Sequence, residues 1–198
     1  MIFYKETFSA LAIILTFVAF FPYIRSVLKN KTKPHVFSWI IWGLTTFIVF
    51  LAQLEGGGGL GAWPIGLSGA ITIYIAVLAY QKKSDISVTK TDWCFFLSAL
   101  ASIPVWIFSS DPLWTVIILT TVDLLGFGPT VRKAYSHPFD ENMTVFIIFT
   151  CRNLAAIIAL ETYSPTTVTF PAAIALACAM LALMIAYRRR ILSKLGCL

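Results

Sequence analysis

Charged residues are scarce in this sequence. Asp, Glu, Lys and Arg together make up 12% of its 198 residues, whereas hydrophobic residues make up 59%. Soluble globular domains carry about 25% charged residues, so this chain has too few to cover a surface that faces water. The composition therefore excludes an ordinary soluble domain and indicates an integral membrane protein.

Residue types and motifs that carry catalysis or metal binding are also few. The chain has two histidines and four cysteines, and the cysteines show no metal-ligand spacing. The glycine run at residues 56–59 is not followed by Lys and Ser or Thr, so it does not match a phosphate-binding loop. No nucleophile–base arrangement or dinucleotide fingerprint is present. We therefore expect no enzymatic activity, no cofactor and no metal site.

Long hydrophobic runs are what the chain has instead. A helix needs about 20 apolar residues to cross the hydrocarbon part of a bilayer, and seven segments approach that length. Their apolar residues are continuous rather than alternating, which favours helices over the strands of a membrane barrel. The sequence predicts an all-α integral membrane protein with seven transmembrane helices, at about residues 8–28, 36–54, 62–80, 93–109, 113–135, 143–160 and 168–187.

The basic residues predict the orientation of the chain. Of the 15 Lys and Arg residues, 13 fall in the first, third and fifth connections or after the last span, and the exceptions are Lys5 and Arg152. Because basic residues favour the cytoplasmic side, we expect the N-terminus outside and the C-terminus in the cytoplasm. This topology accounts for the net charge of +6, so we expect membrane lipid but no nucleic acid as a partner. The compact chain favours a prokaryotic inner membrane.

The sequence also contains an internal repeat. Shifted by 107 residues, it aligns with itself without a gap, and residues 20–83 share ten identities with residues 127–190 over 64 aligned positions. The aligned pairs include Pro22 with Pro129 and Arg25 with Arg132. In a membrane protein, such a repeat is typical of transporters built from two equivalent units.

The repeat divides the spans into two units of three. Residues 1–83 hold the first unit, 84–110 a linker with the fourth span, 111–190 the second unit and 191–198 a cytoplasmic tail. The unpaired fourth span makes the two units parallel, related by an axis along the membrane normal. This arrangement predicts a site near the middle of the membrane, between the units.

The 3+1+3 arrangement resembles the SWEET, PQ-loop and KDEL-receptor superfamily of seven-helix membrane proteins. The stretch FPYIRSVLKNKTKPHVFSW is similar to the PQ-loop motif, with Pro22 at its proline, and FGPTVRKAYSHPFDENMTVF places Pro129 there. Tyr23 and Thr130 stand where the motif has glutamine. The resemblance implies transport of a small solute, or, as in KDEL receptors, a receptor or scaffold that uses the fold without transport.

Two prolines inside helices are candidates for a gate. Pro22 and Pro129 each remove one backbone hydrogen bond and clash with the preceding turn, so each predicts a kink. Paired kinks near the cytoplasmic ends would act as hinges; the alternative is that they only shape helix packing. Pro64 and Pro171 differ, because we expect them to open the third and seventh spans.

Aromatic residues predict two walls of a binding site. Trp39 and Trp42 share a face of the second span, and the repeat puts Phe146 and Phe149 at the matching positions of the sixth. Facing aromatic walls can hold a sugar ring, a heterocycle or a cation. The alternative for tryptophan near a helix end is an anchor at the membrane interface.

Two charges that we expect inside the bilayer give the strongest indication of function. Asp123 and Arg152 would each cost about 2.5–3.5 kcal/mol at a helix centre on insertion scales, so neither should face lipid. They could form a structural ion pair. Alternatively, Asp123 is a proton-coupling site, or Arg152 anchors a substrate carboxylate or phosphate. Asn153 beside Arg152, and Thr45 and Thr46 at the equivalent positions of the first unit, complete the candidate binding residues.

These observations together predict a small-solute transporter that works by alternating access between two three-helix units. The substrate classes that remain open are a sugar, a vitamin, an amino acid and an organic acid. Proton coupling through Asp123 and assembly into a homo-oligomer also remain open. The alternative function is a membrane receptor or scaffold that does not transport.

Overall fold

The computed structural model describes residues 3–30, 34–82, 88 and 90–194. These residues form α-helices, two short 3-10 helices and no strand. The elements are α1 (Phe3–Leu28), α2 (Val36–Glu55), η1 (Gly59–Gly61), α3 (Trp63–Gln81), α4 (Lys90–Ser109), α5 (Pro112–Gly126), α6 (Gly128–Ser136), η2 (Pro138–Asp140), α7 (Met143–Ile158) and α8 (Pro165–Lys194). The prediction of an all-helical fold is therefore confirmed.

Several of these helices could cross a membrane. Five described segments are long and apolar enough: Phe3–Leu28, Val36–Glu55, Gly59–Gln81, Pro112–Ser136 and Pro165–Lys194. Two further apolar helices, Trp93–Ser109 and Met143–Ile158, are shorter. The chain is therefore a membrane-embedded helical protein, as its composition predicts.

Side-chain caps set where several helices begin. His35 Nδ1 accepts a hydrogen bond from the Ser38 backbone N–H at the start of α2, and Asn142 Oδ1 accepts one from Thr144 N–H at the start of α7. Asp111 caps α5 in the same way, immediately before a proline. These side chains satisfy N–H groups that the first turn of a helix leaves without partners.

Helix α8 begins earlier than the sequence analysis predicts. Ser164 N–H donates to Thr167 Oγ1 at 3.0 Å, and Thr167 N–H donates to Ser164 Oγ at 3.3 Å, so the two residues cap the helix start reciprocally. Pro165 occupies the first helical position. The prediction that Pro171 opens this span is wrong, because Pro171 lies buried inside α8. The corresponding prediction that Pro64 opens the third span is correct, since Pro64 lies at the start of α3.

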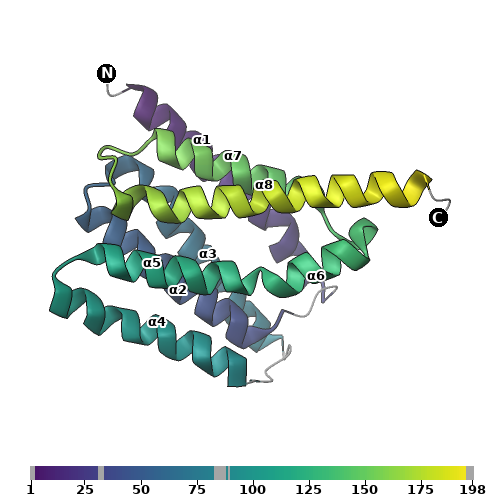
Figure 1. Cartoon of the computed structure of the whole chain (residues 1–198), viewed down its shortest axis with the longest axis horizontal. Coiled ribbons are helices and arrows are strands. Elements are labelled where there is room, and N and C mark those ends of the chain that lie inside the picture. Colours follow the sequence, from purple (N-terminus) through teal and green to yellow (C-terminus); the bar gives the residue numbers. More distant parts are fainter. Residues whose placement is uncertain (1–2, 31–33, 83–87, 89, 195–198) are drawn as a thin grey trace.

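The predicted fifth span is divided rather than continuous. α5 ends at Gly126, α6 begins at Gly128, and the ribbon changes direction between them (Figure 1). Pro129, in the first turn of α6, has no N–H to donate to the carbonyl four residues earlier. The Val131 N–H instead begins a new helical bond to the Phe127 carbonyl at 2.9 Å. By contrast, α1 continues through Pro22 to Leu28.

The helices pack in a regular order. α3 contacts both α1 and α2, and α8 contacts both α5 and α7. The two groups meet where α1 contacts α7 and where α2 contacts α5. α4 lies at the side of the bundle, against α5 and α2 (Figure 1).

Helices α2 and α3 pack closely at two glycines. A methyl group on Gly43 would lie 2.6 Å from Ile73 Cγ1, and one on Gly69 would lie 3.0 Å from the Phe47 backbone nitrogen. The first distance is too short for a real Cβ and the second is tighter than most Cβ contacts, so glycine at each position lets the two helices pack closely. Small residues commonly serve this purpose in membrane helices.

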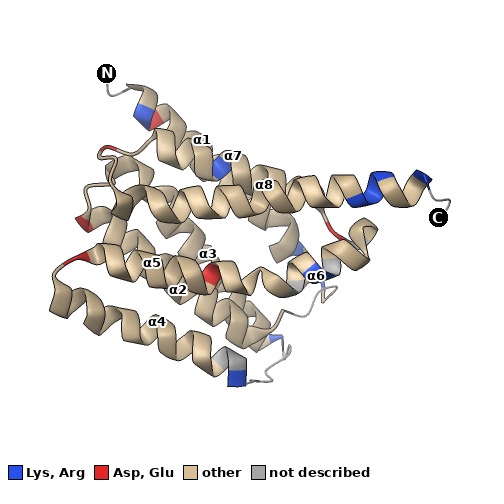
Figure 2. Ribbon diagram, in the orientation of Figure 1, with Lys and Arg blue, Asp and Glu red and all other residues tan. Residues whose placement is uncertain are grey.

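The two ends of the bundle differ in charge. In Figure 2, most Lys and Arg residues lie toward the end where α8 finishes. At the opposite end, Lys5 Nζ lies 3.3 Å from the Glu161 carbonyl oxygen. At the basic end, Arg188 Nε donates to the Tyr135 carbonyl at 3.0 Å and Arg189 Nε donates to the Pro138 carbonyl at 2.9 Å. These arginines therefore hold the α6–α7 connection against α8.

Candidate functional site

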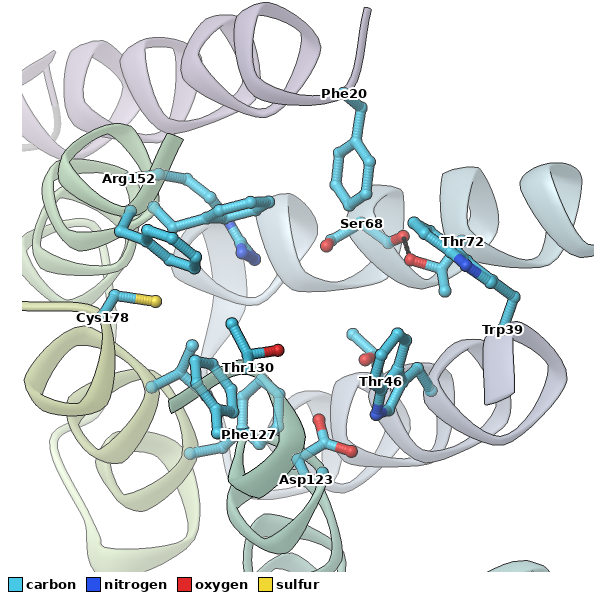
Figure 3. A pocket seen from close by; sticks show the side chains of 16 residues that line it. Phe20, Trp39, Thr46, Ser68, Thr72, Asp123, Phe127, Thr130, Arg152 and Cys178 are labelled. Carbon is cyan, nitrogen blue, oxygen red and sulfur yellow. Dashed lines mark hydrogen bonds between the residues drawn. The ribbon is translucent and has the colours of Figure 1, made fainter. Parts of the chain in front are cut away.

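A cavity of about 250 Å³ lies between the two groups of helices. Its lining comes from α1, α2, α3, α5, α6, α7 and α8 and from the turn between α5 and α6 (Figure 3). The lining residues of α2 and α7 follow helix starts at the basic end, whereas those of α3 and α8 follow helix starts at the opposite end, so the cavity lies in the middle part of the bundle. Ligand pockets in general measure roughly 300–1,000 Å³, so this volume suits a small molecule.

Most of the cavity wall is aromatic. Trp39 and Trp42 meet edge to face with centroids 5.8 Å apart, and Phe20 and Phe149 do so at 5.4 Å. Tyr23 stacks on the outer side of Trp39 at 4.8 Å. Three pairs in the wall are related by the 107-residue shift: Phe20 with Phe127, Trp39 with Phe146, and Trp42 with Phe149.

Gly126 fixes the position of the Trp42 indole. A Cβ at residue 126 would lie 2.8 Å from Trp42 Nε1. Any larger residue would therefore push the indole out of its place. The glycine at the end of α5 lets the ring lie along the wall between α2 and α5.

Asp123 lines the cavity from α5 and is buried, with 7% of its surface exposed. The Thr45 hydroxyl lies 2.8 Å from Asp123 Oδ1 and 3.0 Å from the Trp42 carbonyl oxygen. Among the described residues, no side chain or backbone group donates to the second carboxylate oxygen. That oxygen is therefore available to a proton or to a bound molecule.

Arg152 lines the cavity from α7 and is 3% exposed. Its Nε and Nη2 atoms are buried and have no hydrogen-bond partner within the described residues. Its guanidinium carbon lies 5.8 Å from the centre of the Phe149 ring. In Figure 3 the guanidinium points into the cavity from the side opposite Asp123.

Asp123 and Arg152 are not paired. No ion pair joins the two side chains in the part of the chain that the structure describes, and the guanidinium Nη2 is without any partner there. The structural ion pair, one of the alternatives left open by the sequence, is thus not formed. Two buried groups that carry opposite charges instead face one cavity from separate helices.

The structure separates the remaining candidate binding residues into two sets. Thr46 lines the cavity together with Trp39, Trp42, Phe146, Phe149 and Arg152. Thr45 lies behind the wall, where it supports Asp123. Asn153 also lies outside the wall; its Nδ2 donates to the Phe149 carbonyl of its own helix at 2.8 Å.

The two candidate hinge prolines lie close to the cavity in sequence. Pro22 follows Phe20 by two residues on α1, and its ring is exposed. Pro129 precedes Thr130, another lining residue, in the first turn of α6, and its side chain lies outside the described part of the structure.

Several lining residues are not among the sequence candidates. Phe20 and Phe127 are an identical pair in the 107-residue alignment, so the repeat itself could have indicated them. Ser68 and Thr72 are four residues apart on one face of α3, and the Thr72 hydroxyl donates to the Ser68 carbonyl. Cys178 gives no sequence signal; it is a buried free thiol in the wall from α8.

The end of the bundle opposite the basic end is closed by contacts between two connections. The Glu161 N–H donates to the Gly58 carbonyl at 3.2 Å, and the Thr162 N–H donates to the Gly57 carbonyl at 3.1 Å. Nearby, Gln53 Nε2 donates to the Thr167 carbonyl at 2.7 Å. We call these three contacts the outer seam. They join the end of α2 and the α2–α3 connection to the α7–α8 connection and the start of α8.

No protein-family model, curated protein or solved structure matches this chain. Within the described residues, no three His, Cys, Asp or Glu side chains are grouped so that they could hold a metal ion. The function must therefore be inferred from the cavity and its two unpaired charges.

Proposed function

We propose that the protein is a multi-pass membrane transporter that carries a small solute through the cavity. The observation that supports this most directly is the pair of buried, unpaired charges, Asp123 and Arg152, in a cavity between two helix groups. Unpaired charges at membrane depth are expensive and usually mark a pathway for a solute or a proton. A cavity lined by both groups would be exposed alternately when the groups rock against each other.

The packing order supports two equivalent units. In each group the third helix lies between the first and the second: α3 between α1 and α2, and α8 between α5 and α7. The 107-residue shift exchanges the two contacts between the groups, α1 with α7 and α5 with α2. The N-caps His35 and Asn142 are also 107 residues apart. In this proposal α4 is the linker of a seven-span, 3+1+3 protein of the SWEET and PQ-loop type.

The charge distribution supports the proposed topology. Basic residues gather where α8 ends and where α4 begins (Figure 2), while Lys5 contacts the Glu161 carbonyl at the other end. With basic residues on the cytoplasmic side, the N-terminus would lie outside and the C-terminus in the cytoplasm. The outer seam would then close the cavity toward the outside.

The hydrogen bonds of Asp123 support proton coupling. When Asp123 is ionised, the Thr45 hydroxyl donates to the carboxylate. When Asp123 is protonated, its own O–H donates to Thr45, and the Thr45 hydroxyl then donates to the Trp42 carbonyl. Because a hydroxyl both donates and accepts, both forms have their hydrogen bonds satisfied, which a reversible proton carrier needs.

Uptake into liposomes tests the proposal. Purified protein is reconstituted, and accumulation of sugars, vitamins, amino acids and organic acids is measured with and without an acidic exterior. We expect one class to accumulate and the pH gradient to accelerate it. Asp123→Asn should remove the acceleration, whereas Glu55→Gln, which changes an exposed acid at the end of α2, should not.

Two results would count against this proposal in different ways. Uptake that the pH gradient accelerates equally in Asp123→Asn would remove the proton-coupled version. A lack of uptake for every class, together with a stable protein complex recovered from membranes, would favour the receptor or scaffold.

A further inference from the structure

We infer that the solute is an organic monocarboxylate with a compact apolar body, held by Arg152 and carried together with one proton on Asp123. This inference rests on the proposed transport function and identifies its substrate class. The residues that line the cavity support it, and Arg152 is the first of them.

Among the described residues, the Nε and Nη2 atoms of Arg152 have no partner of the kind that a buried guanidinium requires. An arginine stays protonated in proteins, so its charge at 3% exposure must be compensated by an anion or leave a large penalty. Its two unpartnered donors, Nε and Nη2, form one edge of the guanidinium. That edge matches the two oxygens of a carboxylate in a bidentate pair.

The other charge of the cavity limits the anion to a single negative charge. Arg152 is the one cation in the described lining, and Asp123 faces the same space. A phosphate monoester carries about −1.5 to −2 charges near neutral pH, and a dicarboxylate carries two. Either would leave an excess negative charge beside Asp123, whereas a monocarboxylate is balanced by Arg152 alone.

The aromatic residues of the cavity wall determine which group the solute can carry besides its carboxylate. Aromatic rings from α1, α2 and α7 surround the space between the two charges, among them Phe20, Trp42 and Phe149. These rings favour a flat or branched apolar group. The volume of about 250 Å³ excludes a large solute and fits a single ring or a short branched chain.

Charge balance links the carboxylate to the proton. With Arg152 protonated and Asp123 ionised, the cavity without a solute has a net charge of zero. When a monocarboxylate binds Arg152, protonation of an Asp123 oxygen returns the sum to zero. The cavity is then neutral both without and with the solute. It can therefore change its access from one side of the membrane to the other without the cost of a net charge in a medium of low dielectric constant.

Few other titratable side chains lie near Asp123, so the charge balance depends on the solute carboxylate and on the proton at Asp123. Arg152 on α7 and Cys178 on α8 are the other titratable residues of the described lining, and α2 contributes the hydroxyl of Thr45. Titratable side chains described on α4 and α6, such as Cys94 and Arg132, are exposed.

Binding to the purified protein tests the substrate class. Quenching of tryptophan fluorescence reports on Trp39 and Trp42 in the wall. The probes are phenylacetate and 3-methylbutanoate, their neutral amides, phenyl phosphate and benzene-1,4-dicarboxylate. We expect the two monocarboxylates to bind roughly tenfold or more tightly than the amides, as a charge-assisted bidentate pair would give. Phenyl phosphate and the dicarboxylate should bind no better than the amides.

Matched variants assign the preference to Arg152. Arg152→Gln should bind acid and amide equally, Arg152→Lys should keep part of the preference, and Arg190→Gln, at an exposed position of the same charge, should behave as wild type. Unchanged thermal unfolding of each variant shows that it is folded. Equal binding of acid and amide by the wild type, no binding of any monocarboxylate, or full preference in Arg152→Gln would overturn the inference.

Transport of the bound probe separates this inference from the proposed function. Uptake of the monocarboxylate should be accelerated by an acidic exterior and unaffected by a potassium diffusion potential, because no net charge moves. A carboxylate that binds through Arg152 but is not taken up would refute transport and leave the monocarboxylate site standing. Uptake of a neutral solute that does not need Arg152 would support transport and refute the substrate class.

Discussion

At the scale of single residues, the site depends on which side chains have partners and which do not. Asp123 is supported on one oxygen by Thr45, whereas Arg152 has two buried donors without a partner among the described residues. The sequence indicated both residues, because each interrupts a long apolar run. It could not show that they are unpaired, since pairing depends on how α5 and α7 are placed around the cavity.

The contact between Gly126 and Trp42 gives a prediction at this scale. Gly126→Ala would place a methyl group 2.8 Å from the indole nitrogen and force the ring toward the cavity. Overpacking of this kind costs about 1–3 kcal/mol. We expect a lower thermal unfolding temperature and weaker quenching by a bound solute.

Gly128→Ala is the control for this substitution. Nothing lies within 4 Å of a Cβ added at residue 128, so its unfolding and its solute binding should match those of the wild type. If Gly126→Ala bound the solute as tightly as Gly128→Ala does, the indole would not form part of the binding wall.

At the scale of helices, local sequence signals explain most of the boundaries. The caps at His35, Asp111 and Asn142 each stand just before an apolar run, as capping residues should. The reciprocal pair of Ser164 and Thr167 explains why α8 begins before Pro171. Proline marks a helix start where it directly follows the capping residue, as Pro165 follows Ser164 and Pro112 follows Asp111.

The two repeat-related prolines differ in backbone context, since α1 continues through Pro22 whereas Pro129 follows the break between α5 and α6, and this gives a second prediction. Pro129→Ala would restore an N–H at the junction of α5 and α6, so it should make the junction stiffer. If this junction is a hinge, uptake should fall severalfold while solute binding is kept. The measurement is the initial rate of liposome uptake beside the binding constant from fluorescence.

Pro22→Ala is the matched substitution in the first unit. α1 already continues through Pro22, and removing a proline from a helix interior stabilises it by up to about 3 kcal/mol. We expect higher thermal stability and little change in uptake. The reverse pattern, with Pro22→Ala slowing uptake and Pro129→Ala leaving it intact, would move the hinge to α1.

At the scale of the whole molecule, the outer seam holds the two helix groups together at the end away from the basic residues. Its backbone hydrogen bonds and the Gln53 to Thr167 contact come from segments more than 100 residues apart in sequence. If the groups rock during transport, these contacts must break in each cycle, since the cavity would otherwise never open to that end.

A disulfide across the seam tests this directly. A Cβ at Gly56 would lie 3.3 Å from Thr166 Cβ, close to the spacing of roughly 3.5–4.5 Å in disulfides. The oxidised Gly56→Cys, Thr166→Cys double variant should lose uptake nearly completely, and a reductant should restore it. Each single variant serves as a control. Full uptake by the cross-linked protein would show that the seam does not open.

The sequence by itself determined the class of the protein, most of its helices and the two charges that matter, because apolar run length, basic-residue bias and helix caps are local properties. The 107-residue repeat also indicated four of the aromatic residues that line the cavity: Trp39, Trp42, Phe146 and Phe149. Only the tertiary structure decided that Asp123 and Arg152 face one cavity without pairing, that Thr45 supports the carboxylate and that Asn153 lies outside the wall. Each of these features depends on how different helices pack around the cavity, and the sequence near each residue does not determine that packing.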